Sequence, residues 1–179
     1  MAKELATALK RMTLCRALSA AELDAVAALV ATREVPAGSE LFREGDAGDG
    51  LYLVVAGEIN VVKRSPDGEH LLATLGADGV LGEMSLITLD ARSATGRALS
   101  HTTVLHLPAR EFRALLDSGS TAALKIAAAI ADVLARRLAT MNSMVLELAG
   151  KTEPSGAMRS PLKTQDLAAL HRTMQVWSF

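Results

Sequence analysis

The sequence lacks several features that would assign it to a common class of protein. It has one cysteine, Cys15, so it can form no internal disulfide, and the apolar surroundings of this residue predict a buried, inert thiol. Its 19 Lys and Arg residues nearly balance 20 Asp and Glu residues, which gives a formal net charge of -1. The sequence therefore carries no broad basic footprint, and nucleic acid is not the expected partner.

Long apolar runs are also missing. The longest stretches, such as residues 51–56, are far too short to cross a bilayer. The first five residues, Met1–Leu5, contain no apolar segment of the signal-peptide type. We therefore expect no membrane association and a cytoplasmic protein.

Metal-binding and catalytic patterns are absent as well. The histidines have no metal-ligand spacing and no cysteine or carboxylate cluster beside them, so no metal site is expected and a cupin-type enzyme is disfavoured. These histidines are His70, His101, His106 and His171. With no catalytic constellation in the sequence, we do not expect an enzyme.

The chain shows a clear order of helical and β-type segments. Residues 3–30 predict a helix that ends near Val30, with Ser19 and Glu22 spaced as a capping box. Short apolar runs separated by turn signals follow over residues 33–106 and predict a compact antiparallel β unit, a sandwich or a barrel. Pro108 then opens a helix for which Gly119 is the expected end. The fold class is therefore α+β.

A second, longer helix is predicted over residues 121–149, which contain no Pro or Gly. Apolar residues recur there at alternating spacings of four and three, as in a heptad seam. The seam consists of Ala127, Ala131, Leu134, Leu138, Met141, Val145 and Leu148. It predicts a homodimer through this helix, although the same stripe could pack on the chain's own β unit.

The last 30 residues differ in composition from the rest. Residues 150–163 have the Gly and Pro content of a flexible linker, and a short helix is expected after them. We therefore divide the chain into a domain of residues 1–149 and a tail of residues 150–179. Trp177 could anchor the tail on the domain or act as a lid over a ligand, and the anchor is the preferred interpretation.

The most informative stretch is GEMSLITLDARSAT, residues 82–95. Glu83 to Thr88 can form a short helix whose free backbone N–H groups face an anion, and Arg92 would bring a forked cation to the same place. A phosphate fits such a pair of features. Glu83 would repel a phosphate, so we expect it to accept hydrogen bonds from ligand hydroxyls, such as those of a ribose.

The surroundings of this stretch strengthen the interpretation. Residues 36–61, PAGSELFREGDAGDGLYLVVAGEINV, resemble the opening of the cyclic nucleotide-binding domain family, and the resemblance continues over residues 19–149. That family includes the catabolite activator proteins and the regulatory subunits of cyclic-AMP-dependent protein kinase. The resemblance implies a β-roll with a phosphate-binding cassette over residues 82–95.

The resemblance also implies a role for individual residues. Glu83 takes the position that accepts a hydrogen bond from the ribose 2′-hydroxyl, and Arg92 the position that pairs with the cyclic phosphate. Gly82 and Met84 flank Glu83 in the cassette. The phosphate contact would be completed by Ser93 and Ala94. The sugar and base would be lined by Val61, Leu72, Ala73 and Leu75, and the purine covered by Met141 and Asn142 on the long helix.

Three functions are compatible with the sequence. The preferred one is a module that binds a cyclic nucleotide, cAMP rather than cGMP, and signals to an unidentified partner protein by rearranging its helices, with a hinge near Gly119. A transcription regulator is the second, but residues 150–179 are too few for a helix-turn-helix domain. The third is a scaffold with the same fold that binds no nucleotide.

Overall fold

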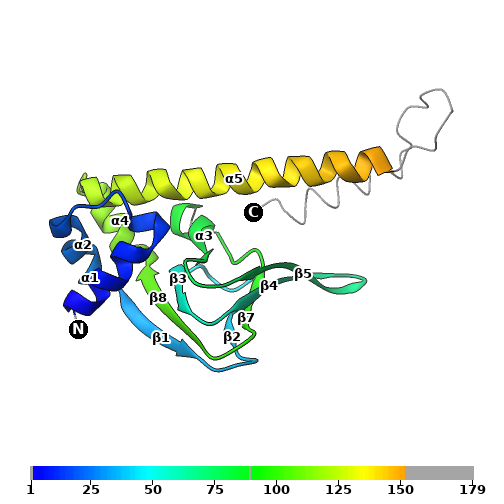
Figure 1. Cartoon of the computed structure of the whole chain (residues 1–179), viewed down its shortest axis with the longest axis horizontal. Coiled ribbons are helices and arrows are strands. Elements are labelled where there is room, and N and C mark those ends of the chain that lie inside the picture. The colour runs from blue at the N-terminus through cyan, green and yellow to red at the C-terminus, as the bar shows by residue number, and fades with distance from the viewer. Residues whose placement is uncertain (1, 89, 152–179) are drawn as a thin grey trace. The chain divides into compact units, whose positions relative to one another are not determined.

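A computed structural model describes residues 2–88 and 90–151, and the chain forms two compact units, Met1–Ile130 and Ala131–Phe179. The first unit holds two N-terminal helices, eight strands, helices α3 and α4 and the first turns of α5 (Figure 1). In the second unit, the described part is the continuation of α5.

The N-terminal segment is not the single helix over residues 3–30 that the sequence predicted. It forms α1 (Ala2–Arg11), a short 3₁₀ helix η1 (Thr13–Cys15) and α2 (Ala20–Ala27). Met12 has extended backbone geometry, which ends α1. The predicted capping box starts the new helix, because the Glu22 N–H donates to the Ser19 hydroxyl (3.3 Å) and the Ser19 N–H donates to the Glu22 carboxylate (2.6 Å).

Eight antiparallel strands form two four-stranded sheets, as predicted for the β unit. The first sheet has the order β1 (Ala31–Val35), β8 (Thr102–Pro108), β3 (Gly50–Ala56) and β6 (Val80–Leu81). The second has the order β2 (Glu40–Phe42), β7 (Thr95–Ala98), β4 (Ile59–Ser65) and β5 (Gly68–Leu75). The predicted α+β fold with an antiparallel β-roll is confirmed.

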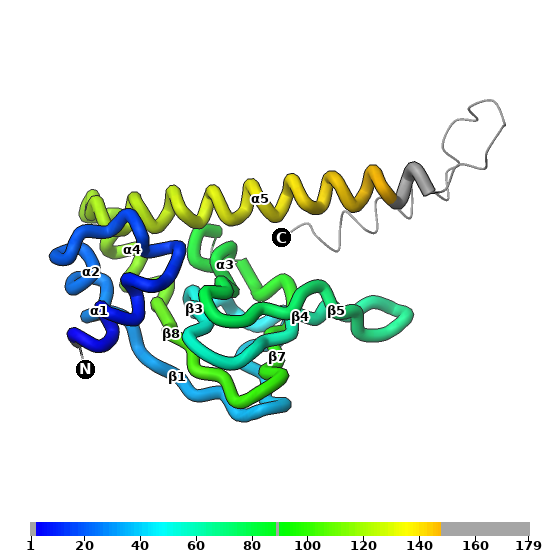
Figure 2. The backbone as a smooth tube through the Cα atoms, viewed as in Figure 1, coloured from blue at the N-terminus to red at the C-terminus, as the bar shows by residue number. Residues whose placement is uncertain are grey.

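The core of the roll lies between the two sheets. Residues from both sheets are buried in it: Val35, Tyr52, Val54, Ile59, Leu81, Ala98 and Val104. Leu41, Phe42, Val61 and Leu75 pack against this cluster. In Figure 2 the β4–β5 hairpin projects away from the end of the roll where the N-terminal helices lie.

A β-bulge interrupts the pairing of β4 with β5. Val61 pairs with Ala73 and Val62 pairs with Leu71, so Leu72 is the extra residue on β5. In a bulge, two residues of one strand oppose a single residue of its partner, which breaks the strict alternation of faces. Leu72 and Ala73 are accordingly both half-buried.

Three further helices complete the fold: α3 (Glu83–Thr88), α4 (Ala109–Asp117) and α5 (Thr121–Lys151). Pro108 is the N-cap of α4, as the sequence predicted. Gly119 ends this helical segment with φ 73°, and the Ser120 N–H donates to the Leu115 carbonyl (3.0 Å), which is the expected glycine C-cap.

The start of α5 belongs to the first unit. Ala122, Ala123, Ile126 and Ile130 are buried there. Lys125 donates to the Glu22 carboxylate (2.8 Å) and so connects α5 to α2. Helices α1, α2 and α4 gather at the same end of the roll as these first turns of α5 (Figure 1).

The long helix is confirmed as an element and extends to Lys151, two residues beyond its predicted end. Its seam and the homodimer stay predictions; Leu138, one of the seam residues, is exposed on the isolated chain. The predicted tail helix and Trp177 lie outside the described residues. Within residues 2–88 and 90–151, no single helix is long and apolar enough to span a membrane, although α4 and residues 121–147 pass that test as a bent pair.

Candidate functional site

The stretch Gly82–Thr95 forms a helix-and-loop segment between β6 and β7. The short helix predicted for it is confirmed as α3, which spans Glu83–Thr88. Gly82 precedes this helix with φ 73°, a left-handed conformation that glycine adopts without strain. Glu83 and Ser85 are buried on α3, and Met84 between them is half-buried.

Arg92 is the centre of the site, and it is only 4% exposed. Its Nη1 donates to the Ser85 hydroxyl (2.8 Å). Its Nη2 donates to the Gly50 carbonyl (2.8 Å) and to the Asp49 carboxylate. Its Nε is buried and has no hydrogen-bond partner among the described residues. Three of the five guanidinium N–H groups are therefore used by the protein, and Nε is the nitrogen without a partner in the part of the chain that the structure describes.

Aromatic rings fix the plane of this guanidinium. Its Cζ lies 4.4 Å from the centroid of the Phe42 ring and 5.4 Å from that of Tyr52. The two rings are themselves stacked, with centroids 5.8 Å apart. A guanidinium over an aromatic face is stabilised electrostatically, so these contacts favour one orientation of Arg92.

Asp49 is the anionic partner of Arg92. The Tyr52 hydroxyl also donates to its carboxylate (2.8 Å). Burial alone would raise the pKa of Asp49, but the hydrogen bonds from Tyr52 and Arg92 outweigh burial and hold the pKa below its usual range. Burial, together with the Asp49 carboxylate, raises the pKa of Tyr52 to about 12. Asp49 is therefore an ionised carboxylate at neutral pH.

His106, on β8, lies next to Asp49 and Tyr52. Its ring stacks on Tyr52, with centroids 4.6 Å apart, and its Nε2 lies 3.6 Å from Asp49 Oδ2. Burial, followed by the charge of Arg33, lowers the pKa of His106. The imidazole is thus neutral at neutral pH, and its Nε2 has no hydrogen-bond partner within the described part of the chain.

The loop between β2 and β3 holds the second half of the cassette by its backbone. The Gly45 N–H donates to the Arg92 carbonyl (2.8 Å), and the Arg92 N–H donates to the Asp46 carbonyl (2.7 Å). The Glu44 N–H donates to the Thr95 hydroxyl (3.0 Å). These bonds fix the backbone of Arg92 independently of its side-chain contacts.

Lys63 adds a side-chain connection to the same segment. Its Nζ donates to the Ser93 carbonyl (2.6 Å) and forms an ion pair with Glu44 (2.8 Å). Burial alone would raise the pKa of Glu44, but the hydrogen bonds from Lys63 and from the Arg64 backbone lower it below its usual range. Strand β4, the β2–β3 loop and the cassette are therefore connected through one ammonium group.

The structure brings some of the predicted site residues together, and the ligand-binding role of every one of them stays a prediction. Gly82, Arg92, Ser93 and Ala94 lie in one segment; an added Cβ on Gly82 would come within 1.9 Å of Arg92 Nη1. Val61 and Leu75 pack against the core of the roll, with Leu72 and Ala73 at the bulge. Met141 and Asn142 are on the part of α5 in the second unit. Their roles as base contacts remain predictions.

Sequence reasoning missed seven side chains of this site: Phe42, Glu44, Asp49, Tyr52, Lys63, Ser85 and His106. No local spacing could have found Asp49, because its pairing with Arg92 spans 43 residues. Lys63 did leave a signal. The alternation that turns Ile59 and Val61 inward puts this lysine on the same face of β4, where a charged side chain needs a partner.

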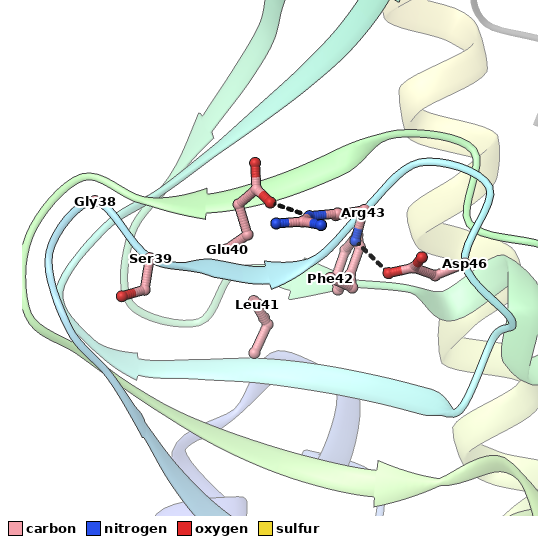
Figure 3. Close-up of a pocket in the computed structure, with 7 residues that line it drawn as sticks. All are labelled: Gly38, Ser39, Glu40, Leu41, Phe42, Arg43 and Asp46. Carbon is pink, nitrogen blue, oxygen red and sulfur yellow. Dashed lines mark hydrogen bonds and ion pairs between the residues drawn. The ribbon is translucent and has the colours of Figure 1, made fainter.

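A separate hollow of about 590 Å³ lies beside β2 (Figure 3). It is lined by Gly38, Ser39, Glu40, Leu41, Phe42, Arg43 and Asp46. Arg43 bridges part of it, because its side chain pairs with Glu40 and its N–H donates to the Asp46 carboxylate (2.9 Å). None of the predicted ligand residues lines this hollow, which shares only Phe42 and Asp46 with the described surroundings of Arg92, so we do not assign the ligand to it.

No group of three or more His, Cys, Asp or Glu side chains that could hold a metal ion occurs within the described ranges. Two carboxylates pair with cations here instead, since Arg92 pairs with Asp49 and Lys63 pairs with Glu44. The site thus offers a buried cation, a buried carboxylate and backbone donors, a set suited to an organic anion that also carries hydroxyl groups.

Comparison with known proteins agrees with this chemistry. The sequence profile of the cyclic nucleotide-binding domain matches residues 32–118. The cyclic AMP receptor protein of Thermus thermophilus is 34% identical over 131 residues, which are 73% of this chain and 59% of that protein. The N-terminal domain of a transcriptional regulator from Streptomyces coelicolor is 33% identical, with a TM-score of 0.60 over 76% of this chain and 94% of that one. A cyclic nucleotide-binding domain from Methylobacillus flagellatus is 26% identical, with a TM-score of 0.70 over 87% and 86% of the two chains.

The chain belongs to the cyclic nucleotide-binding domain family. The predicted family membership is confirmed, and the cassette around Arg92 lies within the matched residues. The chain spans about half the length of the curated relatives that it matches, for example 50% of a cAMP-activated global transcriptional regulator of Mycobacterium tuberculosis.

Proposed function

We propose that this chain is a sensor for a cyclic nucleotide, cAMP in preference to cGMP. The observation that carries the proposal is the buried guanidinium of Arg92, held by Ser85, Asp49 and Gly50, whose Nε lacks a partner among the described residues. A buried donor without a partner costs about 1–3 kcal/mol. A phosphate oxygen that accepts from Nε would remove this penalty.

The remaining cassette residues supply the other contacts in this proposal. Glu83 cannot pair with a phosphate, since both are anionic, but it can accept a hydrogen bond from the ribose 2′-hydroxyl. The backbone of Ser93 and Ala94 would complete the phosphate contact. The sugar and base would lie against Val61, Leu72, Ala73 and Leu75. The name of the Thermus relative, cyclic AMP receptor protein, supports cAMP as the ligand.

A signal can leave the site through the helices next to the cassette. The Arg113 side chain of α4 donates to the Ile87 carbonyl at the end of α3 (3.0 Å). Gly119 then joins α4 to α5, and its backbone is the proposed hinge. A ligand shifts such an equilibrium only if it binds one helix arrangement better than the other. We propose that the change reaches an unidentified partner protein, or a second copy of this chain, through α5.

The test is calorimetric titration of the full chain and of Arg92→Ala with cAMP. Loss of the charge-assisted contact to a desolvated phosphate weakens binding by about 2–5 kcal/mol, which is roughly 30-fold to several-thousand-fold in Kd. Arg97→Ala is the matched control, because Arg97 lies on the adjacent strand β7 and pairs with Glu40 and Glu69 (3.1 and 3.0 Å). We expect its affinity to stay within about twofold of the parent.

Arg92→Lys keeps the positive charge if the alanine variant unfolds. We expect weaker binding than in the parent, because an ammonium cannot use the guanidinium fork. Equal affinity of the parent and both Arg92 variants would rule out this cassette assignment.

A transcription regulator is the second candidate, because the Streptomyces coelicolor structure is part of one. An electrophoretic mobility shift with cAMP present tests it, and a ligand-dependent shift at physiological salt would favour it over the preferred function. The third candidate function is a scaffold that binds no nucleotide. In that case calorimetric titration of the folded parent protein would give no heat with cAMP or with cGMP.

A further inference from the structure

Lys63 occupies an unusual place for a lysine. It is on β4, its side chain is 21% exposed, and its Nζ meets both the Ser93 carbonyl (2.6 Å) and the Glu44 carboxylate (2.8 Å). The same carboxylate accepts the Arg64 N–H (3.1 Å). The Glu44 carboxylate therefore holds the Lys63 ammonium in place, and the ammonium in turn holds the Ser93 carbonyl.

The bond to Ser93 determines the direction of the next N–H group. The described residues contain no cis peptide bond, and in a trans peptide the carbonyl oxygen and the following N–H point to opposite sides. When Lys63 holds the Ser93 oxygen, the Ala94 N–H must point away from Lys63. An ammonium on the carbonyl also polarises the peptide, which makes that N–H a stronger donor.

We propose that Lys63 is a positioning residue for the bound nucleotide. It locks the Ser93–Ala94 peptide in the orientation in which the Ala94 N–H serves one exocyclic oxygen of the cyclic phosphate, while Arg92 serves the other. Its own charge is matched by Glu44, so it acts through the peptide and makes no direct contact with the phosphate. This inference rests on the proposed function and adds to it the residue that orients the second phosphate donor.

The test uses the two phosphorothioate diastereomers of cAMP, each of which replaces one exocyclic oxygen by sulfur. The ratio of the affinities for the two diastereomers shows which exocyclic oxygen has lost its hydrogen-bond donor. A change in the stability of the whole protein affects both affinities alike and leaves this ratio unchanged. For Lys63→Met we expect cAMP to bind about tenfold more weakly, because the Ala94 N–H is no longer held in place to donate to the charged phosphate. We also expect the diastereomer ratio to change by at least about threefold, since only one oxygen loses its positioned donor.

Two further variants sharpen the test. Lys63→Arg can donate to the same carbonyl and should restore most of the parent ratio. Lys125→Met is the matched control, because it removes another lysine paired with a glutamate at 2.8 Å, on α5 and away from the cassette. We expect it to leave the ratio unchanged.

The outcomes separate this inference from the proposed function. If the parent protein binds no cyclic nucleotide, the proposed function fails. If the parent binds and Arg92→Ala does not, but Lys63→Met keeps both the parent affinity and the parent ratio, only the role of Lys63 is overturned. A uniform weakening of all three ligands with an unchanged ratio overturns it as well.

Discussion

The substitution Gly82→Ala tests whether the cassette is built around the guanidinium of Arg92. An added Cβ would lie 1.9 Å from Arg92 Nη1 and 2.8 Å from the Gly50 carbonyl oxygen. Neither approach is possible, so the guanidinium must move and its bond to Ser85 must break. The side chain has little room for this movement, because Phe42 packs against its flat face.

Two terms make up the expected loss of stability. A non-glycine residue at φ 73° costs about 1–2 kcal/mol. Breaking one hydrogen bond to a buried charged group costs about 1.5–3 kcal/mol more. We therefore expect Gly82→Ala to lower the free energy of unfolding by about 2.5–5 kcal/mol.

Gly119→Ala is the matched control for this experiment. Gly119 has the same φ of 73°, but an added Cβ there would meet no atom within 4 Å. Both variants carry the backbone term and the same entropy change in the unfolded chain, so the difference between them isolates the contact with Arg92. Urea unfolding should show this difference as about 1.5–3 kcal/mol, and the melting temperatures should differ by roughly 3–12 °C. Equal losses in the two variants would refute the packing of Gly82 on Arg92.

Two other predictions concern the groups around Arg92. Asp49→Asn removes the carboxylate from a buried guanidinium and should lower the free energy of unfolding by about 1–2 kcal/mol, since Asp49 is partly exposed; an unchanged urea midpoint would contradict the ion pair. His106 has a pKa lowered in the folded state, so the unfolded chain takes up a proton first as the pH falls below about 6.5. The stability contributed by the neutral ring is complete above that pH and declines below it. His106→Phe should flatten the dependence of stability on pH between about 5 and 7, measured by urea unfolding, and an unaltered slope would show that His106 does not titrate as described.

Much of the fold was predictable because its signals are local. The capping box at Ser19, the Pro108 start and the Gly119 end each depend on residues within one or two helical turns. The position of α3 over Glu83–Thr88 was also predicted from the local sequence. The break between α1 and α2 was missed because the apolar spacing continues across it, while the extended backbone of Met12 is set by tertiary packing.

The contacts that organise the site were less accessible from the sequence. Arg92 could be identified from the cassette, but its partner Asp49 precedes it by 43 residues and is brought to it only when the two sheets close. The Leu72 bulge depends on the register of β4 against β5, which alternation alone does not fix. Arg92 was therefore expected as a free cation facing a ligand, whereas the structure shows it already held by Ser85, Asp49 and Gly50 with Nε left over.

The most direct test of the central claim is calorimetric titration of the full chain with cAMP and cGMP in parallel, with Arg92→Ala as the reference. The proposal predicts saturable binding of cAMP, weaker binding of cGMP, and loss of both in a folded Arg92→Ala protein. A folded parent protein that gives no heat and no shift in melting temperature with either nucleotide would contradict it.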